Sequence, residues 1–371
     1  PDPRGARWAF LWAVLLAVLI LCAVYPGFMS YDSLHALREA RGAVRGGPYP
    51  TIVSYLWRPL DRLFPGPAAM LLVQDAVLLA AIAGFLVWSG LGTGKAMAGL
   101  ALVAIAPPVL GPILVVWKDV AMSASFAAAA LVLCLLDTGR LQRRAWLAAA
   151  VLLVFVGMAY RLNALPATIP LLVWAALIHA RRGARGGKAA LLRGAALGVV
   201  LAGVLYAGVT VLNSFRLPDF SRLDPNPSLR AFQIYDLIGI AARTGDARFA
   251  ARAGLDEAEV LNEARRGYDP RHLNLAVAAA PDGLIAGYVA SAPAPQVASA
   301  WRDAVLEHPG VYLAHRWETF RELVGLTSRE VFYPTHGRVD PNEFGYEHRP
   351  NAVSRFLVTY LNDACDASPV R

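Results

Sequence analysis

The stretch YPGFMSYDSLHALR, residues 25–38, decides how this chain is organised, because a long apolar run ends there and a polar segment begins. The Pro-Gly pair at 26–27 favours the end of a first helix, and Ser30 favours the cap of a second one. On that second helix Asp32 and His35 would share one face, with arginines following at helical spacing. We therefore expect acid, imidazole and cations to converge where a membrane helix leaves the bilayer.

Composition excludes an ordinary soluble protein. Of the 371 residues, 57% are hydrophobic and 17% are charged, whereas soluble domains average about half apolar and a quarter charged. The net charge of +8 arises from short basic clusters between apolar runs, which is typical of cytoplasmic loops and differs from the contiguous basic patch of nucleic-acid binding. The three cysteines are too isolated for a disulfide framework or a metal cluster. The composition predicts an all-α polytopic membrane protein that binds no nucleic acid.

Seven apolar runs are each roughly long enough to cross the hydrocarbon core, which needs about 17–25 residues, although the fifth is marginal. They are Trp8 to Tyr25, Ala68 to Trp88, Ala96 to Trp117, Val120 to Leu136, Ala145 to Tyr160, Ala164 to Ala180 and Ala189 to Leu212. No small-residue cleavage site follows the first run, which favours a retained anchor. About seven transmembrane helices are predicted.

Basic residues in alternate connections set the expected orientation. Arginines or lysines precede the first run and lie in every second connection after it, so the N-terminus is expected to be cytoplasmic. The long connection 26–67 and everything after residue 213 are then extracytoplasmic. This divides the chain into a transmembrane module, residues 1–213, and a mainly helical extracytoplasmic domain, residues 214–371. In the outward loop 26–67, residues 51–64 read as an interfacial amphipathic helix.

Prolines in two runs predict broken helices on the outward side. The third run contains Pro107, Pro108 and Pro112, and the sixth contains Pro166 and Pro170. Broken helices at membrane depth normally line a cavity. We expect that cavity on the outward side.

The outward connections also carry the candidate chemistry. Asp32 fits a general base or a metal ligand, although an acid in the first turn of a helix is equally expected as a cap. His35 is a candidate ligand or proton shuttle, against a plain surface role. Lys118 and Asp119 share one short turn, where they would act on substrate or only snorkel and pair at the membrane edge.

Two further positions complete the candidate set. Arg161, beside Asn163, suits a phosphate oxygen pair, or else anchors the membrane edge. Asp75 lies about 10 Å into the second run at the helical rise. An acid at that depth is expected to face the bundle interior with a partner. It marks a functional site or a buried structural pair with Arg161 or Lys118.

The order and sidedness of these features resemble the GT-C superfamily of membrane glycosyltransferases. The resemblance covers Trp8 to Leu212: a first helix, a long outward loop with an acid close after it and two interfacial helices, then further helices. The residues Tyr31-Asp32-Ser33 look like the motif that carries the catalytic acid of that family. Lys118 and Asp119 lie where a second outward acid or lysine is often found, and Arg161 is similar in position to cations that hold the lipid phosphate.

The resemblance implies an inverting hexosyl- or pentosyltransferase in the cytoplasmic membrane of a bacterium. Its donor would be a polyprenyl-phosphate sugar and its acceptor a lipid, a glycan or a protein. Asp32 and Asp119 would be catalytic, and Tyr31, His35, Asp75, Lys118, Arg161 and Asn163 would bind substrate. The sequence specifies no cofactor and leaves open a divalent Mg²⁺ or Mn²⁺ held by Asp32.

Two other classes remain open from the sequence. A transporter or flippase would use the broken helices and Asp75 as parts of a substrate pathway, but no two related halves are visible. A non-catalytic membrane scaffold would not need its outward charges to converge. The distances among Asp32, Asp119 and Arg161 separate these readings.

Overall fold

The computed structural model of the chain describes residues 3–43, 50–142, 144–183, 188–214, 227–272, 282–327 and 335–366. Within these residues the structure is helical and contains no strand, only two isolated bridges. The chain divides into two compact units. Unit 1 comprises residues 1–220 and 333–367, and unit 2 comprises residues 221–332 with the last four residues.

Unit 1 contains the apolar helices, and all seven predicted runs are helical. They form α1 (Pro3–Val24), α4 (Ala68–Trp88), the pair α5 (Thr93–Ile105) and α6 (Pro107–Ile113), α7 (Lys118–Asp137), α8 (Arg144–Tyr160), α9 (Leu165–Gly183) and α10 (Lys188–Ser214). Four of them, α1, α4, α7 and α10, are long and apolar enough to cross a membrane. The pair α5 and α6 makes a fifth span if counted as one, while α8 and α9 hold shorter apolar stretches. These helices indicate a helical membrane protein with four to five clear spans among the described residues.

The two expected helix breaks had different outcomes. The third run is bent by 72° between Ile105 and Pro107, where Ala106 is extended and Pro107 begins α6. In the sixth run the prediction of a break was wrong, since α9 is one helix that continues through Pro170. A short 3-10 turn, η1 (Leu162–Ala164), precedes it, so Pro166 falls in the first turn of α9, where a proline costs no helical hydrogen bond.

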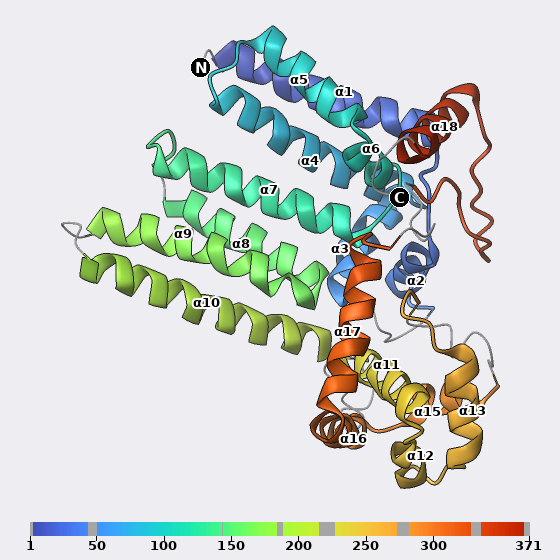
Figure 1. The fold of residues 1–371 in the computed structure, drawn as a ribbon. Helices are drawn as coiled ribbons and strands as arrows, with labels where there is room; N and C mark the ends of the chain where they lie inside the picture. The colour runs from blue at the N-terminus through green and yellow to red at the C-terminus, as the bar shows by residue number, and fades with distance from the viewer. Residues whose placement is uncertain are drawn as a thin grey trace. The chain divides into compact units, whose positions relative to one another are not determined.

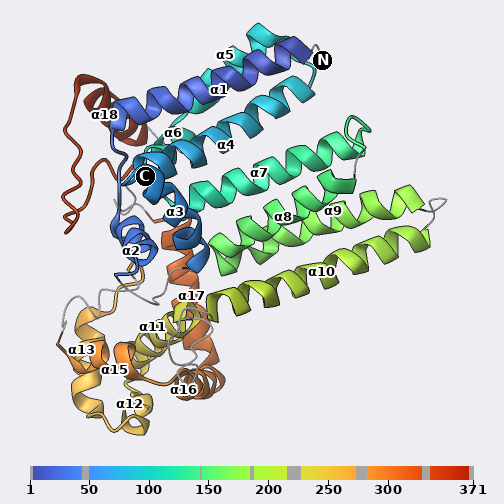
Figure 2. The same cartoon turned by 180° about the vertical axis from the view of Figure 1, so that it is seen from behind.

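The long helices of unit 1 lie side by side and alternate in direction (Figures 1 and 2). The N-terminus, the end of α7 and the start of α10 lie at one end of this bundle. The basic residues of that end include Arg4, Lys95, Arg140 and Lys188. The start of α7 and the end of α10 lie at the other end, with α2 (Tyr31–Ala40) and α3 (Thr51–Leu63). We call this second end the α2 end.

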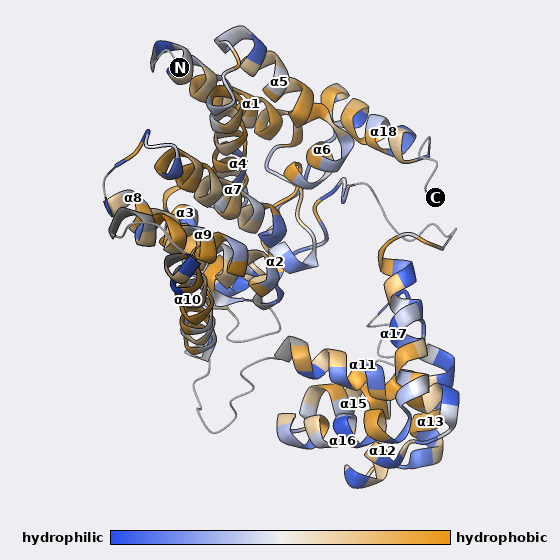
Figure 3. Cartoon of the chain, turned by 60° about the vertical axis from the view of Figure 1, so that its left-hand side comes forward, coloured by the Kyte–Doolittle hydropathy of each residue, from blue (hydrophilic) through white to orange (hydrophobic). Residues whose placement is uncertain are grey.

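Helices α9 and α10 approach each other closely. A Cβ on Gly198 would lie 2.4 Å from the Cα of Val173, so any side chain there would force the two backbones apart. Gly194 lies one turn earlier, where a Cβ would meet Leu177 at 2.7 Å. This small-xxx-small spacing is typical of helix pairs packed in membranes. Figure 3 shows that both helices consist mostly of apolar residues, as expected of helices in a membrane.

The chain returns to unit 1 after residue 333, which differs from the predicted division into 1–213 and 214–371. Met29 and Val339 form a bridge, with Met29 N–H donating to Arg338 and Asp340 N–H donating to Met29. Farther on, α18 (Ala352–Asp366) places the Tyr360 hydroxyl 3.2 Å from the carbonyl of Ile105. We call residues 335–351 the strap. Sequence patterns missed this return because its contacts are about 300 residues apart in the chain.

Unit 2 is a separate helical bundle built from α11 (Pro227–Thr244), α12 (Arg248–Arg252), α13 (Glu257–Gly267), α15 (Leu284–Ser291), α16 (Ala294–Glu307) and α17 (Pro309–Leu323). Its apolar core is centred on α11 and includes Ile234, Ile238 and Val260. Polar side chains are also buried in this bundle, and among them is the fully buried carboxylate of Asp236. Trp301 Nε1 donates to it at 2.7 Å, and Arg316 donates at 2.8 Å. The unit is mainly helical, as expected.

Candidate functional site

The site at the α2 end is built on two extended segments that join helices. Residues 28–30 lead into α2, and residues 114–117 lead from α6 into α7. The N–H of Phe28 donates to Leu114 O at 3.2 Å, and the N–H of Val116 donates to Phe28 O at 3.0 Å. Because both segments are extended, their N–H and C=O groups are free to pair with each other. The starts of α2 and α7 are thereby fixed next to each other.

Side chains strengthen this junction. The Ser33 hydroxyl donates to the carbonyl of Val116 at 2.6 Å, and Trp117 Nε1 donates to the Ser30 hydroxyl at 2.9 Å. Ser30 stands at the N-cap of α2 as expected, but its side chain makes no cap hydrogen bond. It serves the contact with Trp117 instead. The first turns of the two helices are thus connected through both backbone and side chains.

Asp32 and Lys118 form the first charge pair of the site. Lys118 Nζ donates to Asp32 Oδ2 at 2.6 Å. The lysine side chain is only 13% exposed, whereas the Asp32 side chain is 43% exposed. Asp32 is therefore in contact with a buried cation on one side and open to its surroundings on the other. Helix capping alone would not account for this contact between Asp32 and the first residue of α7.

Asp119 and Arg161 form the second pair. Arg161 Nη1 donates to Asp119 Oδ1, and both side chains are about two-fifths exposed. Asp119 lies in the first turn of α7, directly after Lys118, while Arg161 lies between α8 and η1. Of the residues whose distances were to separate a reaction centre from a scaffold, Asp119 and Arg161 are in contact. Lys118 and Asp119 are consecutive in α7, and we call the two pairs together, Asp32, Lys118, Asp119 and Arg161, the row.

The other predicted surface residues of the site lie on α2 and in η1, close in sequence to Asp32 and Arg161. Tyr31 is exposed, and the guanidinium of Arg38 lies 5.9 Å from its ring centre. His35 follows Asp32 by three residues on α2 and is half-buried. Asn163 is exposed within η1, close in sequence to Arg161.

Asp75 is fully buried in α4, as its depth predicts, but its partner is not a cation. Gln74 Nε2 donates to Asp75 Oδ1 at 3.3 Å and to the carbonyl of Val115 at 2.8 Å. Asp75 Oδ2 has no hydrogen-bond partner among the described residues. The alternative of a buried pair with Arg161 or Lys118 is wrong, since both cations face other acids. Gln74 therefore connects the buried acid to the segment 114–117, which leads into Lys118.

A second layer of ion pairs fixes α2 from its outer side. The guanidinium of Arg38 makes two hydrogen bonds of 2.6 Å to Glu343 in the strap. Arg41 makes two of 2.8 Å to Asp61 on α3 and a third to the Tyr346 hydroxyl. Burial acts to raise the pKa of Asp61, but hydrogen bonds from Arg41 and Gly66 hold it below the usual 3.8. Arg38 and Arg41, two of the arginines that follow Asp32 at helical spacing, are thus held in ion pairs with Glu343 and Asp61.

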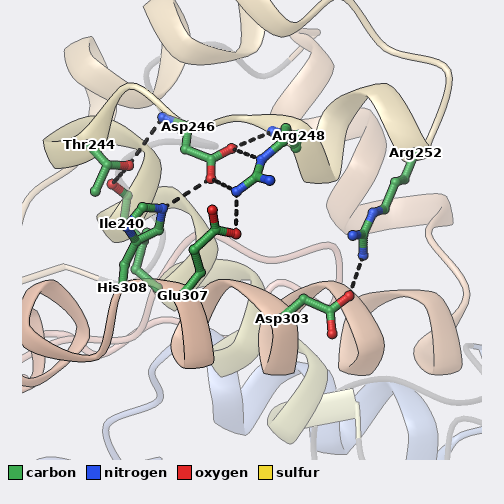
Figure 4. Close-up of polar contacts among 8 residues, drawn as sticks. All are labelled: Ile240, Thr244, Asp246, Arg248, Arg252, Asp303, Glu307 and His308. Carbon is green, nitrogen blue, oxygen red and sulfur yellow. Dashed lines mark hydrogen bonds and ion pairs between the residues drawn. The ribbon is translucent and has the colours of Figure 1, made fainter.

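The carboxylates of the α2 end do not fit a divalent metal site. Metal ligands must converge on one point, whereas Asp32 and Asp119 each accept a hydrogen bond from their own cation. Among the described residues, one group has metal-ligand spacing: Asp246, Glu307 and His308 in unit 2. There the guanidinium of Arg248 lies between the two carboxylates and donates to both (Figure 4). That group is therefore explained as an ion-pair cluster.

Sequence reasoning missed several residues of the site. Ser30, Ser33 and Trp117 join the two segments, and Glu39 accepts a hydrogen bond of 2.5 Å from Ser54 of α3. For Glu39 the sequence did hold a signal, because this acid lies among the apolar residues of α2 that are buried. The strap contacts have no local signal at all.

Comparison with known proteins adds no relative. The chain matches no protein-family model, no curated protein and no solved structure.

The row of charges at the α2 end has a definite chemical capacity. It presents two carboxylates that can accept protons and two cations that can bind an anion, all partly exposed. An anionic group that bound Lys118 or Arg161 would replace the acid now paired with that cation. The acid would then be free to act on a neighbouring hydroxyl.

Proposed function

We propose that the protein is a GT-C-type membrane glycosyltransferase whose reaction centre is the row Asp32, Lys118, Asp119 and Arg161. The observation that carries this proposal is the hydrogen bond of 2.6 Å between Lys118 and Asp32, which joins two helix starts that are 86 residues apart. A partly exposed acid in contact with a mostly buried cation is suited to a reaction that removes a proton while an anion leaves. A second acid–cation pair, Asp119 with Arg161, lies at the same end of the bundle, and both of its side chains are partly exposed.

The donor in this proposal is a polyprenyl-phosphate sugar, and the transferred group is a hexose or a pentose. The acceptor is a lipid, a glycan or a protein with a free hydroxyl. The acceptor oxygen attacks the anomeric carbon, a new glycosidic C–O bond forms, and the C–O bond to the phosphate breaks. The bonding electrons leave with polyprenyl phosphate. A single displacement of this kind inverts the anomeric configuration.

Each residue of the row has a separate task. Asp32 accepts the proton of the acceptor hydroxyl. Lys118 leaves Asp32 and donates to a phosphate oxygen, where a cation stabilises the charge that develops as the bond breaks. Arg161, with its planar guanidinium, binds a pair of phosphate oxygens, and Asp119 orients Arg161 in the resting state. Tyr31, His35 and Asn163 are placed to contact the sugar or the acceptor.

In this proposal the α2 end faces the outer side of the bacterial cytoplasmic membrane, with the N-terminus in the cytoplasm. The basic residues at the opposite end of unit 1 support that orientation, because positive charge favours the cytoplasmic side. Unit 2 then lies outside the cytoplasm, where it would bind the acceptor.

Transport is the second candidate, and one observation favours it. Asp75 Oδ2 is buried in a membrane helix without a hydrogen-bond partner in the described part of the chain, beside the bent pair α5 and α6. Buried acids and broken helices are features of substrate pathways in transporters. A flippase would move the lipid-linked sugar without breaking its bond to phosphate.

Substitution at Asp32 tests the transferase. Asp32→Asn keeps the size of the side chain and its contact with Lys118 but removes the base, so sugar transfer by reconstituted protein should fall by about 10²–10⁴-fold. Asp137→Asn, at the opposite end of α7, is the matched control and should retain wild-type transfer. Equal transfer by the wild type and Asp32→Asn would remove Asp32 from the mechanism.

A further inference from the structure

Helix α17 of unit 2 buries two of its polar residues and exposes several large apolar ones. His315 is fully buried, with Nε2 3.0 Å from Asp236 and Nδ1 2.7 Å from the Tyr268 hydroxyl. Glu322 is also buried and accepts a hydrogen bond from Thr327. These contacts fix which side of α17 faces the core of unit 2. The helix is not free to rotate its apolar side inward.

The outward side of α17 is strongly apolar. It carries Leu313, Trp317, Phe320, Leu323 and Val324, which are between 44% and 69% exposed. The rings of Trp317 and Phe320 stack with their centres 5.7 Å apart. We call these five residues the outer face of α17. Single exposed apolar residues are ordinary, but a contiguous group of this size marks an interaction surface.

The exposed apolar residues of unit 2 are concentrated where the chain enters and leaves it. Among the described residues 227–327, the strongly exposed large apolar side chains are Leu229 and Phe232, in the first turns of α11, and others between residues 306 and 326. The described residues between them, 233–272 and 282–305, contribute none. The apolar surface therefore accompanies the two connections to unit 1.

Both connections lead to membrane helices. The first joins Pro227 to Ser214, the last residue of the span α10. The second joins Thr327 to Thr335, whose hydroxyl donates to the carbonyl of Gly111 in α6, part of the bent apolar pair. Seven residues separate Thr327 from Thr335, so even an extended chain reaches at most about 30 Å. The described segment that follows α17 thus ends at most about 30 Å of chain from a residue that contacts α6.

We propose that the outer face of α17 binds the lipid surface of the membrane from which α10 emerges. A tryptophan beside aliphatic residues suits the boundary between headgroups and acyl chains. The exposed Arg321, within the same stretch, is placed to reach lipid phosphate while its stem lies along the apolar surface. This docking concerns unit 2 and does not depend on the reaction assigned to unit 1.

Site-directed spin labelling of the full chain tests the proposal. In a background with Cys22→Ala, Cys134→Ala and Cys365→Ser, one nitroxide is attached at Trp317→Cys in nanodiscs of phosphatidylcholine and phosphatidylglycerol. Native Cys22, exposed near the end of α1 and kept in a separate sample, is the lipid standard. Ala258→Cys, exposed on α13, is the water standard and also lacks Cys22. Collision rates with oxygen, which concentrates in lipid, and with a water-soluble nickel chelate are then compared.

Lipid docking predicts a positive logarithm of the oxygen-to-nickel ratio at position 317, as at Cys22, and a negative value at position 258. A negative value at 317 would place α17 in water and overturn the proposal. Low rates with both reagents would show protein cover, by unit 1 or a second copy, and would also overturn it. Leu313→Cys labels the same face independently, and helical content by circular dichroism confirms that each variant is folded.

Discussion

The fully buried carboxylate of Asp236 offers the sharpest test of how unit 2 is held together. It connects three helices, because Trp301 of α16 and Arg316 of α17 donate to it and His315 lies 3.0 Å away. Asp236→Asn keeps the shape but removes the charge and turns one acceptor oxygen into a donor. The remaining oxygen can still accept from Trp301 and Arg316 while the new N–H group faces His315 Nε2, so the main change is the loss of negative charge opposite Arg316.

The size of the effect follows from the burial of each partner. Removing one member of a buried ion pair costs about 3–5 kcal/mol, because the partner charge is left without compensation. The Arg316 side chain is 37% exposed, so water can compensate part of its charge. We therefore expect the lower end, about 3 kcal/mol. At 1.4 kcal/mol per tenfold, that is roughly a 100-fold change in the equilibrium for opening.

Hydrogen exchange of the full chain measures this directly. The slowest amides of α11, α16 and α17 should exchange roughly 100-fold faster in Asp236→Asn, because they become accessible only when the bundle opens. Asp303→Asn on α16 is the control, since it removes an exposed pair with Arg252 of α12 and should leave these amides almost unchanged. An acceleration under about tenfold would refute the assignment of Asp236 as the polar centre of unit 2.

Two further predictions concern the surface ion pairs. Arg41→Met removes the hydrogen bonds to Asp61 and Tyr346, so the backbone amides of residues 342–346 should exchange hydrogen faster. Arg349→Met is the control, because that side chain is 91% exposed and its loss should not change their exchange. Equal exchange in the two variants would show that Arg41 does not hold the strap. In unit 2, the hydrogen bond from Arg271 lowers the pKa of Asp269 from 3.8 to about 2, and hydrogen bonds from Arg248 lower the pKa of Asp246 (Figure 4). Because both folded-state pKa values are depressed, their stabilisation is complete above the unfolded value of 3.8 and is lost as the pH falls toward 2. The thermal midpoint of unit 2 should therefore not depend on these groups above about pH 4 and should decrease as the pH falls below 4. The dependence of the midpoint on pH should be weaker in the double variant Asp246→Asn, Asp269→Asn. An unchanged pH dependence would show that these two acids do not cause it.

Helices were predictable in this chain because local signals define them. Apolar runs gave all seven helical segments of the bundle, and Pro107 marked the bend between α5 and α6. The same reasoning gave a wrong prediction at Pro170, since a proline inside a membrane helix can be accommodated by neighbouring groups. The outcome at Pro170 depends on the packing of α9, which its own sequence does not contain.

The candidate site was predictable in its members and less so in its pairings. The order of apolar runs placed Asp32, Lys118, Asp119 and Arg161 at one end, and they lie there in two pairs. Which acid meets which cation depends on the contacts of residues 28–33 with 114–117, which no periodicity reveals. Asp75 shows the same limit, because its burial followed from depth while its partner, the adjacent Gln74, did not.

The division of the chain was the least predictable feature. A polar C-terminal stretch after a series of membrane helices indicates one separate domain, yet residues 335–366 pack on unit 1. Their contacts, such as that of Asn351 Nδ2 with the carbonyl of Ala23 at 2.8 Å, join opposite ends of the sequence. Such pairs carry no signal in one sequence read alone.

The fate of the donor is the measurement that tests the proposed function most directly. Wild-type protein, reconstituted in vesicles, is given polyprenyl-phosphate hexoses and pentoses together with lipid and glycan acceptors, and released polyprenyl phosphate is quantified. A transferase breaks the sugar–phosphate bond, so polyprenyl phosphate and an inverted glycoside should form in equal amounts, and only when an acceptor is present. Movement of an intact donor across the bilayer without bond cleavage would contradict the transferase and favour a flippase.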